Sequence, residues 1–311
     1  MSSQQDLNEL ATDVRVIGQF PDVKVTENPL AITVEGAPYQ LDLAAWLVAR
    51  LDVAASREPA HSVSGEFAVR DNAHDLVRVF GVRYAATPAD FQSFATCLRS
   101  VSRIPLIFVT NNTRLMVVRT NPANLALAQW IFDNMDQPPG QLDASPRTFV
   151  RKADPATPEA EDALDTVRLL HPKYATTVQD LQEMATVIRS VGEIRMLFAD
   201  SPTRTILVRS TAPVVDFATA VFSQLDQQQA PPSTAAPFET SVAGTDELLQ
   251  IIYLPAAKSV AEFQTQVTSI RKQTGIRRVF TYNRTKAMVV RGTPSELAQA
   301  GELVKSLRSA K

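Results

Sequence analysis

The 311-residue chain contains few of the residue types that support catalysis or cross-linking. It has one cysteine, so no disulfide can form within the chain. Its three histidines, His61, His74 and His171, show no metal-ligand spacing, and we expect them to be surface or loop residues. Only 10 glycines are present, and none forms a phosphate-binding loop. The sequence therefore predicts no catalytic site, no metal and no cofactor.

Charge and hydropathy argue against two further classes of protein. The formal net charge is −2, without the basic excess of a nucleic-acid-binding domain. No run of 18 apolar residues occurs, so we expect no membrane span. The first ten residues lack the basic and apolar parts of a signal peptide, which indicates a cytoplasmic protein if Met1 is the true start.

An internal repeat organises the chain. Residues 76–136 recur as 166–226 and 248–308, and a shortened copy ends at Asp52. Each full copy predicts a strand, a helix, two strands and a second helix. We therefore expect an α+β fold built of tandem β-α-β-β-α modules, each a small three-stranded sheet with two helices on one face. The first copy begins at a helix cap, Ser3, and lacks the first strand.

The copies are separated by linkers rich in Pro, Ser, Ala and Gln, which are typical of semi-extended tethers. The predicted modules are 1–52, 66–137, 148–227 and 238–311, with linkers 53–65, 138–147 and 228–237. A short apolar stretch after each linker (EFAVR, TFVRK, PFETS) is expected to add an edge strand. We expect the four modules to fold as nearly independent beads with few contacts between them.

Capping residues mark the helix starts. Thr87 with Asp90 and Ser259 with Glu262 form capping-box patterns, which explains these carboxylates structurally. Cys97 lies on the first helix of the second module, and we expect it to be partly buried without a catalytic role.

The last strand of each hairpin has one face that is always large and apolar, which should meet the helices. The opposite face ends with an arginine beside apolar residues in each full copy. A sheet covered by helices on one side leaves the other side for water or a partner. Arginine beside apolar surface is typical of protein interfaces. The predicted protein-contact residues are Leu115, Val117, Arg119, Thr205, Leu207, Arg209, Ala287, Val289 and Arg291.

The repeated segments FVTNNTRLMVVRTNP, LFADSPTRTILVRST and VFTYNRTKAMVVRGTP, with a VRVFGVRYA-type first strand and a closing helix, carry a family resemblance. Together they resemble the short, KH-like N-terminal modules of bacterial secretins, in tandem and without the secretin pore domain. The resemblance implies a non-enzymatic scaffold of a secretion system in the periplasm. Its implied partners are a second copy of itself, as a homo-oligomer or ring, or secretion and pilus proteins of the envelope.

Two departures from that family lead to a further expectation. No pore domain follows Lys311, and no signal peptide precedes Met1. We expect the chain to be part of a longer exported protein whose upstream residues supply the missing first strand.

Two other functions share the same element order. A KH-like RNA-binding repeat protein would need a GxxG loop, which is absent, and would be more basic. A passive spacer array, whose repeats only set a length, is the other alternative.

Overall fold

The computed structural model describes residues 4–52, 65–70, 75–138, 145–152, 165–232, 236–242 and 245–309. Ser3, His61 and His74 lie outside the described residues, as do most residues of the linkers 53–65 and 138–147. The chain divides into two compact units: unit 1 is residues 1–142 with 151–156, and unit 2 is residues 143–150 with 157–311. The first two modules fall in unit 1 and the last two in unit 2.

Unit 1 contains four helices and six strands among its described residues. In chain order they are α1 (Gln4–Gly18), β1 (Val23–Glu27), β2 (Leu30–Val34), α2 (Pro38–Leu51), β3 (Glu66–Ala68), β4 (Leu76–Gly81), α3 (Pro88–Ser102), β5 (Leu106–Thr110), β6 (Leu115–Thr120) and α4 (Pro122–Met135).

Unit 2 repeats the order strand, strand, helix, strand, strand, helix twice. Its described elements are β7 (Arg147–Val150), β8 (Thr166–Leu170), α5 (Val178–Gly192), β9 (Met196–Asp200), β10 (Thr205–Ser210), α6 (Ala212–Leu225), β11 (Phe238–Ser241), β12 (Leu248–Tyr253), α7 (Val260–Thr274), β13 (Arg278–Tyr282), β14 (Ala287–Gly292) and α8 (Pro294–Ser309).

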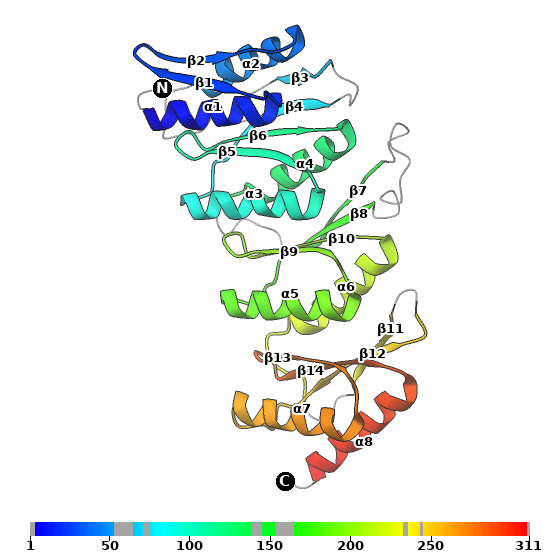
Figure 1. Ribbon diagram of the computed structural model, residues 1–311. Coiled ribbons are helices and arrows are strands. Elements are labelled where there is room, and N and C mark those ends of the chain that lie inside the picture. The colour runs from blue at the N-terminus through cyan, green and yellow to red at the C-terminus, as the bar shows by residue number, and fades with distance from the viewer. Residues whose placement is uncertain are drawn as a thin grey trace. The chain divides into compact units, whose positions relative to one another are not determined.

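The predicted α+β fold of repeated modules is confirmed (Figure 1). Each full module has an antiparallel sheet, with strand orders β3-β4-β6-β5, β7-β8-β10-β9 and β11-β12-β14-β13. The sheets have four strands because the apolar stretch after each linker adds an edge strand, as predicted.

The helix starts follow from local sequence. The Thr87 hydroxyl accepts a hydrogen bond from the Asp90 amide, and the Asp90 carboxylate accepts one from the Thr87 amide. Ser259 likewise accepts from the amide of Glu262. These bonds satisfy amides that have no partner within the helix, so the chain turns into a helix at Thr87 and at Ser259.

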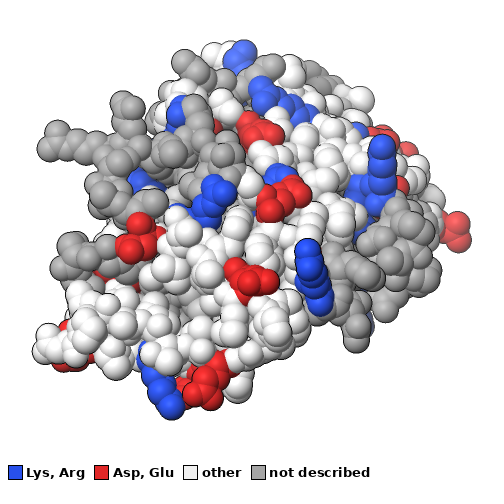
Figure 2. Space-filling model, turned by 90° about the horizontal axis from the view of Figure 1, so that it is seen from above, with Lys and Arg blue, Asp and Glu red and all other residues white. Residues whose placement is uncertain are grey.

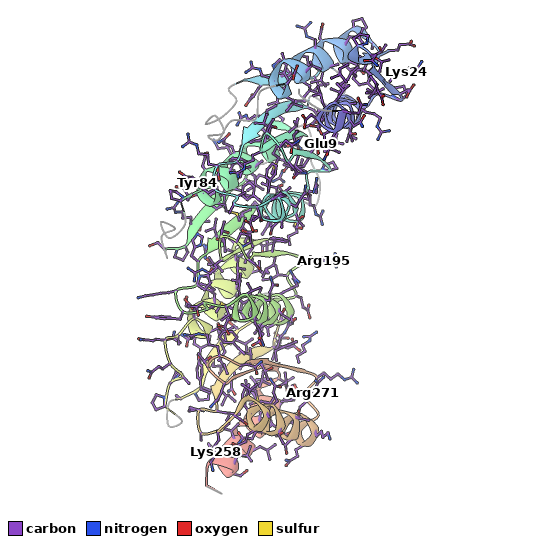
Figure 3. The ribbon with its side chains drawn as sticks, turned by 90° about the vertical axis from the view of Figure 1, so that its left-hand side faces the viewer. Glu9, Lys24, Tyr84, Arg195, Lys258 and Arg271 are labelled. Atoms are coloured by element: carbon purple, nitrogen blue, oxygen red, sulfur yellow. The ribbon has the colours of Figure 1, made fainter. Side chains whose placement is uncertain are left out.

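The first module has only two strands, β1 and β2, in the described residues. Strands β3 and β4 belong to the sheet of the second module, so the EFAVR stretch does not replace the missing strand. The outward face of this two-stranded sheet is polar, with Lys24 (labelled in Figure 3), Thr33 and Glu35 exposed.

Within each unit one apolar cluster spans the two modules. In unit 1, Leu10 and Val14 of α1 and Leu47 of α2 cluster with Val117 and other residues of the second module's sheet. In unit 2, residues of α5 and α6 cluster with Val289 and its neighbours in the fourth module's sheet. The expectation of nearly independent beads is therefore wrong within each unit, because the helices of one module bury the sheet of the next.

In the fourth module the outer face of the first helix is polar. Its first helix, α7, buries only Phe263, Val267 and Ile270, which face its own sheet. Gln273, at a position that is apolar in the other modules, is exposed. Polar outer faces of this kind are typical of capping repeats in stacked arrays.

Candidate functional site: the repeated module junction

The predicted contact face is buried where it was expected to be open. In unit 1, Leu115, Val117 and Arg119 on β6 lie beneath α1 and α2 of the first module. The same holds in unit 2 for three residues of β14, which α5 and α6 cover: Ala287, Val289 and Arg291. The expectation of a face open to water is wrong because it considered each module alone, whereas the helices of the preceding module supply an apolar cover.

The remaining three of the nine predicted contact residues lie on β10. Thr205, Leu207 and Arg209 are buried, and the Thr205 hydroxyl lies 2.9 Å from Nδ1 of His171. His171, the residue after β8, is buried as well, so it lies in a connection between elements, as predicted, but not at the surface. Contact of the nine predicted residues with another protein stays a prediction.

The arginine that ends the face makes the same contact in both units. Arg119 is 3% exposed, and its Nη1 donates to the carbonyl oxygen of Ile17 at 2.8 Å. Arg291, also 3% exposed, donates to the carbonyl of Val191 at 2.6 Å. Ile17 and Val191 each stand next to the last residue of the first helix, where carbonyl groups have no partner within the helix and the helix dipole is negative.

A carboxylate completes each arginine site. Nε of Arg119 lies 3.0 Å from the Asp75 carboxylate, and Nε of Arg291 lies 2.5 Å from the Glu247 carboxylate. A buried guanidinium is tolerated only when its charge and donors are satisfied, and here both conditions are met. The arginine therefore fixes the helix end of one module on the sheet of the next.

A second junction position differs between the units. In unit 1 the Asp13 side chain is fully buried and accepts a 2.7 Å hydrogen bond from the Thr110 hydroxyl. Burial raises the pKa of Asp13 to about 7, and its other carboxyl oxygen has no hydrogen-bond partner. In unit 2 the equivalent positions hold Val187 and Tyr282, which share the same apolar cluster. The two junctions thus have equal geometry and different chemistry.

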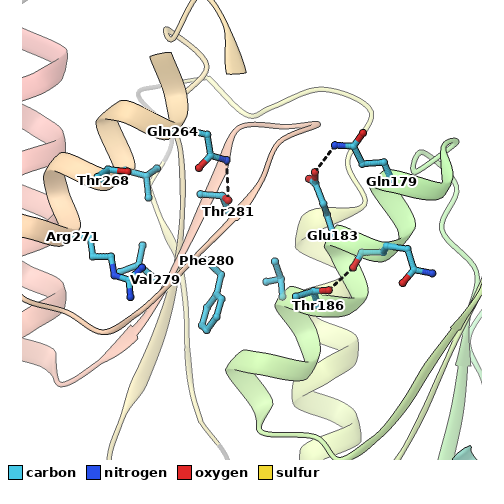
Figure 4. Close-up of a pocket in the computed structure, with 12 residues that line it drawn as sticks. Gln179, Glu183, Thr186, Gln264, Thr268, Arg271, Val279, Phe280 and Thr281 are labelled. Atoms are coloured by element: carbon cyan, nitrogen blue, oxygen red, sulfur yellow. Dashed lines mark hydrogen bonds between the residues drawn. The ribbon is translucent and has the colours of Figure 1, made fainter. Parts of the chain in front are cut away.

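Beside each junction runs a groove along the free edge of the sheet. In unit 2 it measures about 460 Å³ and lies between α5 and α7, next to β13 (Figure 4). In unit 1 an equivalent groove of about 620 Å³ lies between α1 and α3, next to β5. The equivalent lining residues are Glu9 and Glu183, Thr12 and Thr186, Gln92 and Gln264, Arg99 and Arg271, and Phe108 and Phe280.

The side chains that line the grooves are better suited to binding an extended peptide backbone than to catalysing a reaction. Long amide side chains line both walls, and a phenylalanine of the edge strand lies in the lining. Nη2 of Arg99 donates to the Ile107 carbonyl of β5 at 2.6 Å, so this arginine partly covers the strand edge. Covering an edge with charged side chains limits unwanted pairing with other strands. These grooves were not found from the sequence; the recurrence of Gln and Arg in the first helix was the available signal.

No group of three or more histidine, cysteine or acidic side chains that could hold a metal is present among the described residues. Cys97 is fully buried, with its Sγ 4.0 Å from the sulfur of Met135. None of the described helices has the length and apolar character needed to cross a membrane.

Comparison with solved structures finds secretins, although no protein-family model and no curated protein matches the chain. Aeromonas hydrophila ExeD is 13% identical over 76% of this chain and 41% of its own, with a TM-score of 0.17. The N-terminal domain of the secretin XcpQ from Pseudomonas aeruginosa is 16% identical over 45% of this chain and 61% of its own, with a TM-score of 0.20. The type II secretion system secretin GspD of E. coli K12 is 11% identical over 76% of this chain and 39% of its own, with a TM-score of 0.17.

The resemblance to secretin N-terminal modules that the repeats predict is thus found among solved structures. The chain spans 41%, 61% and 39% of the lengths of these three structures, so it matches only a part of each. At these identities and TM-scores the similarity concerns the fold, and it carries no argument about chemistry, assembly or partners.

Proposed function

We propose that this chain is a non-enzymatic scaffold of stacked interaction modules, of the kind found at the N-terminal side of bacterial secretins, and that it works in the periplasm. Its partners are copies of itself or envelope proteins of a secretion or pilus system. The observation that supports this most is the repeated junction. The same arginine contact and the same lateral groove occur in both units.

A repeated groove suits multivalent binding. One groove along one strand edge is small, and single contacts of this size are weak. Two equivalent grooves on one chain raise the overall affinity because the second contact forms at high effective concentration. The arginine contacts hold the modules of a unit in register, which keeps the geometry of each groove constant. A spacer needs neither the grooves nor their repeated lining.

The charge on the face shown in Figure 2 gives the RNA-binding alternative no support. On the face in Figure 2, basic and acidic side chains are interspersed among the described residues, without a continuous basic area. A protein that binds an RNA backbone without sequence preference needs such an area.

Sedimentation velocity of the full chain over a wide concentration range tests the assembly. We expect concentration-dependent oligomers that Thr186→Arg in the groove of unit 2 weakens, because the new side chain fills the groove. Thr265→Arg on α7 is the matched control. Both threonine hydroxyls bond the carbonyl four residues earlier, at 2.7 and 2.9 Å, and Thr265 does not line the groove.

A strict monomer at every concentration would contradict self-assembly through the grooves. Equal weakening by the two arginine variants would show that the groove is not the contact. If in addition no envelope secretion protein bound the wild-type chain, the scaffold proposal would fail and the spacer alternative would remain.

A further inference from the structure

The groove between α5 and α7 in unit 2 offers a positive charge that is free to bind. Its two charged lining residues are Glu183 and Arg271. The Glu183 carboxylate accepts hydrogen bonds from the backbone amide and from Nδ2 of Asn283, at 3.0 and 2.8 Å. Arg271 is exposed, and no ion pair joins it to another described residue. The charge that this groove can offer to a ligand is therefore that of the Arg271 guanidinium.

Arg271 differs in this respect from its equivalents in the second and third modules. Arg99 and Arg189 each donate from Nη2 to a carbonyl of their own edge strand, β5 and β9, at 2.6 Å. Nη2 of Arg271 lies 3.4 Å from the carbonyl oxygen of Arg277, which is beyond the usual length of such a bond. The guanidinium of Arg271 is thus not held on β13, and it can bind a group from outside.

Further cations lie on the same side of unit 2. Lys272 stands near the end of α7 and Arg277 just before β13, and both are exposed. Arg195, just before β9, is also exposed, and Figure 3 shows Arg195 and Arg271 extending to the same side. No ion pair joins these side chains to another described residue. We call the set Arg195, Arg271, Lys272 and Arg277 the basic edge.

The acidic side chains at this end of unit 2 are already paired. Glu193 lies 2.7 Å and Glu247 lies 2.6 Å from Arg278, and Glu247 also contacts Arg291 at 2.5 Å. The positive charge of the basic edge is therefore not compensated within the part of unit 2 that the structure describes.

The complementary charge lies in the connection between β7 and β8. From Thr157 to Val167 the sequence contains four acidic residues and no lysine, arginine or histidine. Three of them, Glu159, Glu161 and Asp162, lie outside the described residues. In the sheet order β7-β8-β10-β9, the two strands that this connection joins lie at one edge and β9 at the other. Three strand spacings of about 4.8 Å separate β7 from β9, or about 14 Å.

We propose that the basic edge of unit 2 binds the acidic segment 157–165 of a second copy of this chain. The proposal rests on the self-assembly proposed above and names its contact. Because the acidic connection starts from the opposite edge of the sheet, a copy lying alongside presents it to the basic edge directly. Within one chain it would have to cross the width of the sheet.

The contact joins two different surfaces, so each copy keeps one surface of each kind for a further neighbour. A single exposed ion pair contributes little to affinity, and for this reason the segment uses several carboxylates at once. The planar guanidinium of Arg271 suits a carboxylate through two parallel hydrogen bonds, and Lys272 and Arg277 add charge beside it.

Complementary charge reversal in the full chain tests the contact. Arg271→Glu with Lys272→Glu reverses the basic edge, and Glu159→Lys with Glu161→Lys reverses the segment. In sedimentation velocity at low ionic strength, we expect each variant alone to associate about tenfold or more weakly than wild type, because like charges then face each other. An equimolar mixture of the two variants should regain association, since each supplies the surface that the other lacks. Wild-type association should fall as ionic strength rises.

Lys24→Glu with Lys258→Glu is the matched control. It changes the net charge by the same amount as reversal of the basic edge, at two exposed positions labelled in Figure 3. Lys24 lies in unit 1, and Lys258 stands before the start of α7, whereas Arg271 is in its last turn. This variant should associate as wild type does. Circular dichroism verifies that every variant folds.

The outcomes separate this contact from the assembly on which it rests. A wild-type chain that stays monomeric would overturn both. Reversed variants that associate as wild type does, or a mixture that associates no better than its components, would overturn this contact alone. Equal loss in the control would overturn it too, because net charge would then be the cause. Loss on reversal of the basic edge but not of the segment would show another acidic occupant and overturn the assignment to segment 157–165.

Discussion

The buried carboxyl group of Asp13 predicts that the junction in unit 1 weakens as pH rises. Burial is the largest cause of its raised pKa; the bond from Thr110 opposes the rise, and the charge of Glu9 adds to it. Asp13→Asn keeps the size of the side chain and an oxygen that accepts from Thr110. The substitution removes the ionisation but replaces one carboxyl oxygen with an amide NH2 group, so the difference in pH dependence reports the effect of charge at this site.

The direction in which the free energy of unfolding changes with pH follows from proton binding. In the unfolded chain Asp13 ionises near its ordinary pKa of 3.8, whereas in the folded chain its pKa is about 7. Between these values the folded state binds more protons, so the free energy of unfolding falls as pH rises and levels off above about pH 7. A pKa displaced from 3.8 to about 7 corresponds to roughly 4 kcal/mol. We expect wild type and Asp13→Asn to be similar near about pH 4, and the variant to be more stable by up to that amount at about pH 8.

Tryptophan fluorescence during urea unfolding measures unit 1 selectively, because the chain's two tryptophans, Trp46 and Trp130, both lie in unit 1. The midpoint and slope are compared across pH for wild type and Asp13→Asn. Asp42→Asn is the matched control, since it removes an exposed carboxylate from the same unit and should leave the pH dependence unchanged. An equal pH dependence in wild type and Asp13→Asn, or a variant that is less stable at high pH, would refute the reasoning.

Four further substitutions test the junction and the burial around α2 and α4. Arg119→Met should lower the free energy of unfolding of unit 1 by about 2–4 kcal/mol, because Asp75 and a helix-end carbonyl lose their hydrogen-bond donor. The urea midpoint, followed by tryptophan fluorescence, measures this loss, and an unchanged midpoint would contradict the prediction. Tyr282→Phe should leave unit 2 as stable or stabilise it by up to about 1 kcal/mol in calorimetry, because the buried hydroxyl has no hydrogen-bond partner; a clear loss would show a missed partner. Leu41→Ala should lower the free energy of unfolding by less than about 1 kcal/mol, and Leu125→Ala should lower it by about 2–5 kcal/mol, because only Leu125 is buried. Urea unfolding measures both values, and equal losses of stability would contradict the exposure of Leu41.

Local sequence was sufficient to predict the elements of each module. The capping boxes at Thr87 and Ser259 and the short hairpins depend on contacts between residues close in the chain. The edge strand at Phe238 also followed from a short apolar run. Such contacts form whatever lies around the module, and the repeat supplied the same pattern several times.

The junction could not be predicted in the same way. Arg119 was predicted to be a protein-contact residue on the open face of the sheet, and its partner, the carbonyl of Ile17, is 102 residues away in sequence. The grooves beside β5 and β13 and the exposure of Leu41 likewise depend on which helix covers which strand. A carbonyl at a helix end has no signature in its own residue type, so no pattern of letters indicates the contact.

The sequence by itself determined the module: where its helices and strands begin and end, how many copies exist, and which copy lacks a strand. Only the tertiary structure decided that the modules of a unit bury one another's faces, because the free energy of covering an apolar sheet depends on the helices that happen to lie over it. The sequence pattern of an arginine beside valines is the same whether water or a helix end contacts the arginine. In the folded chain Arg119 donates to the carbonyl of Ile17 and Arg291 donates to the carbonyl of Val191. Strand β2 pairs only with β1 among the described residues.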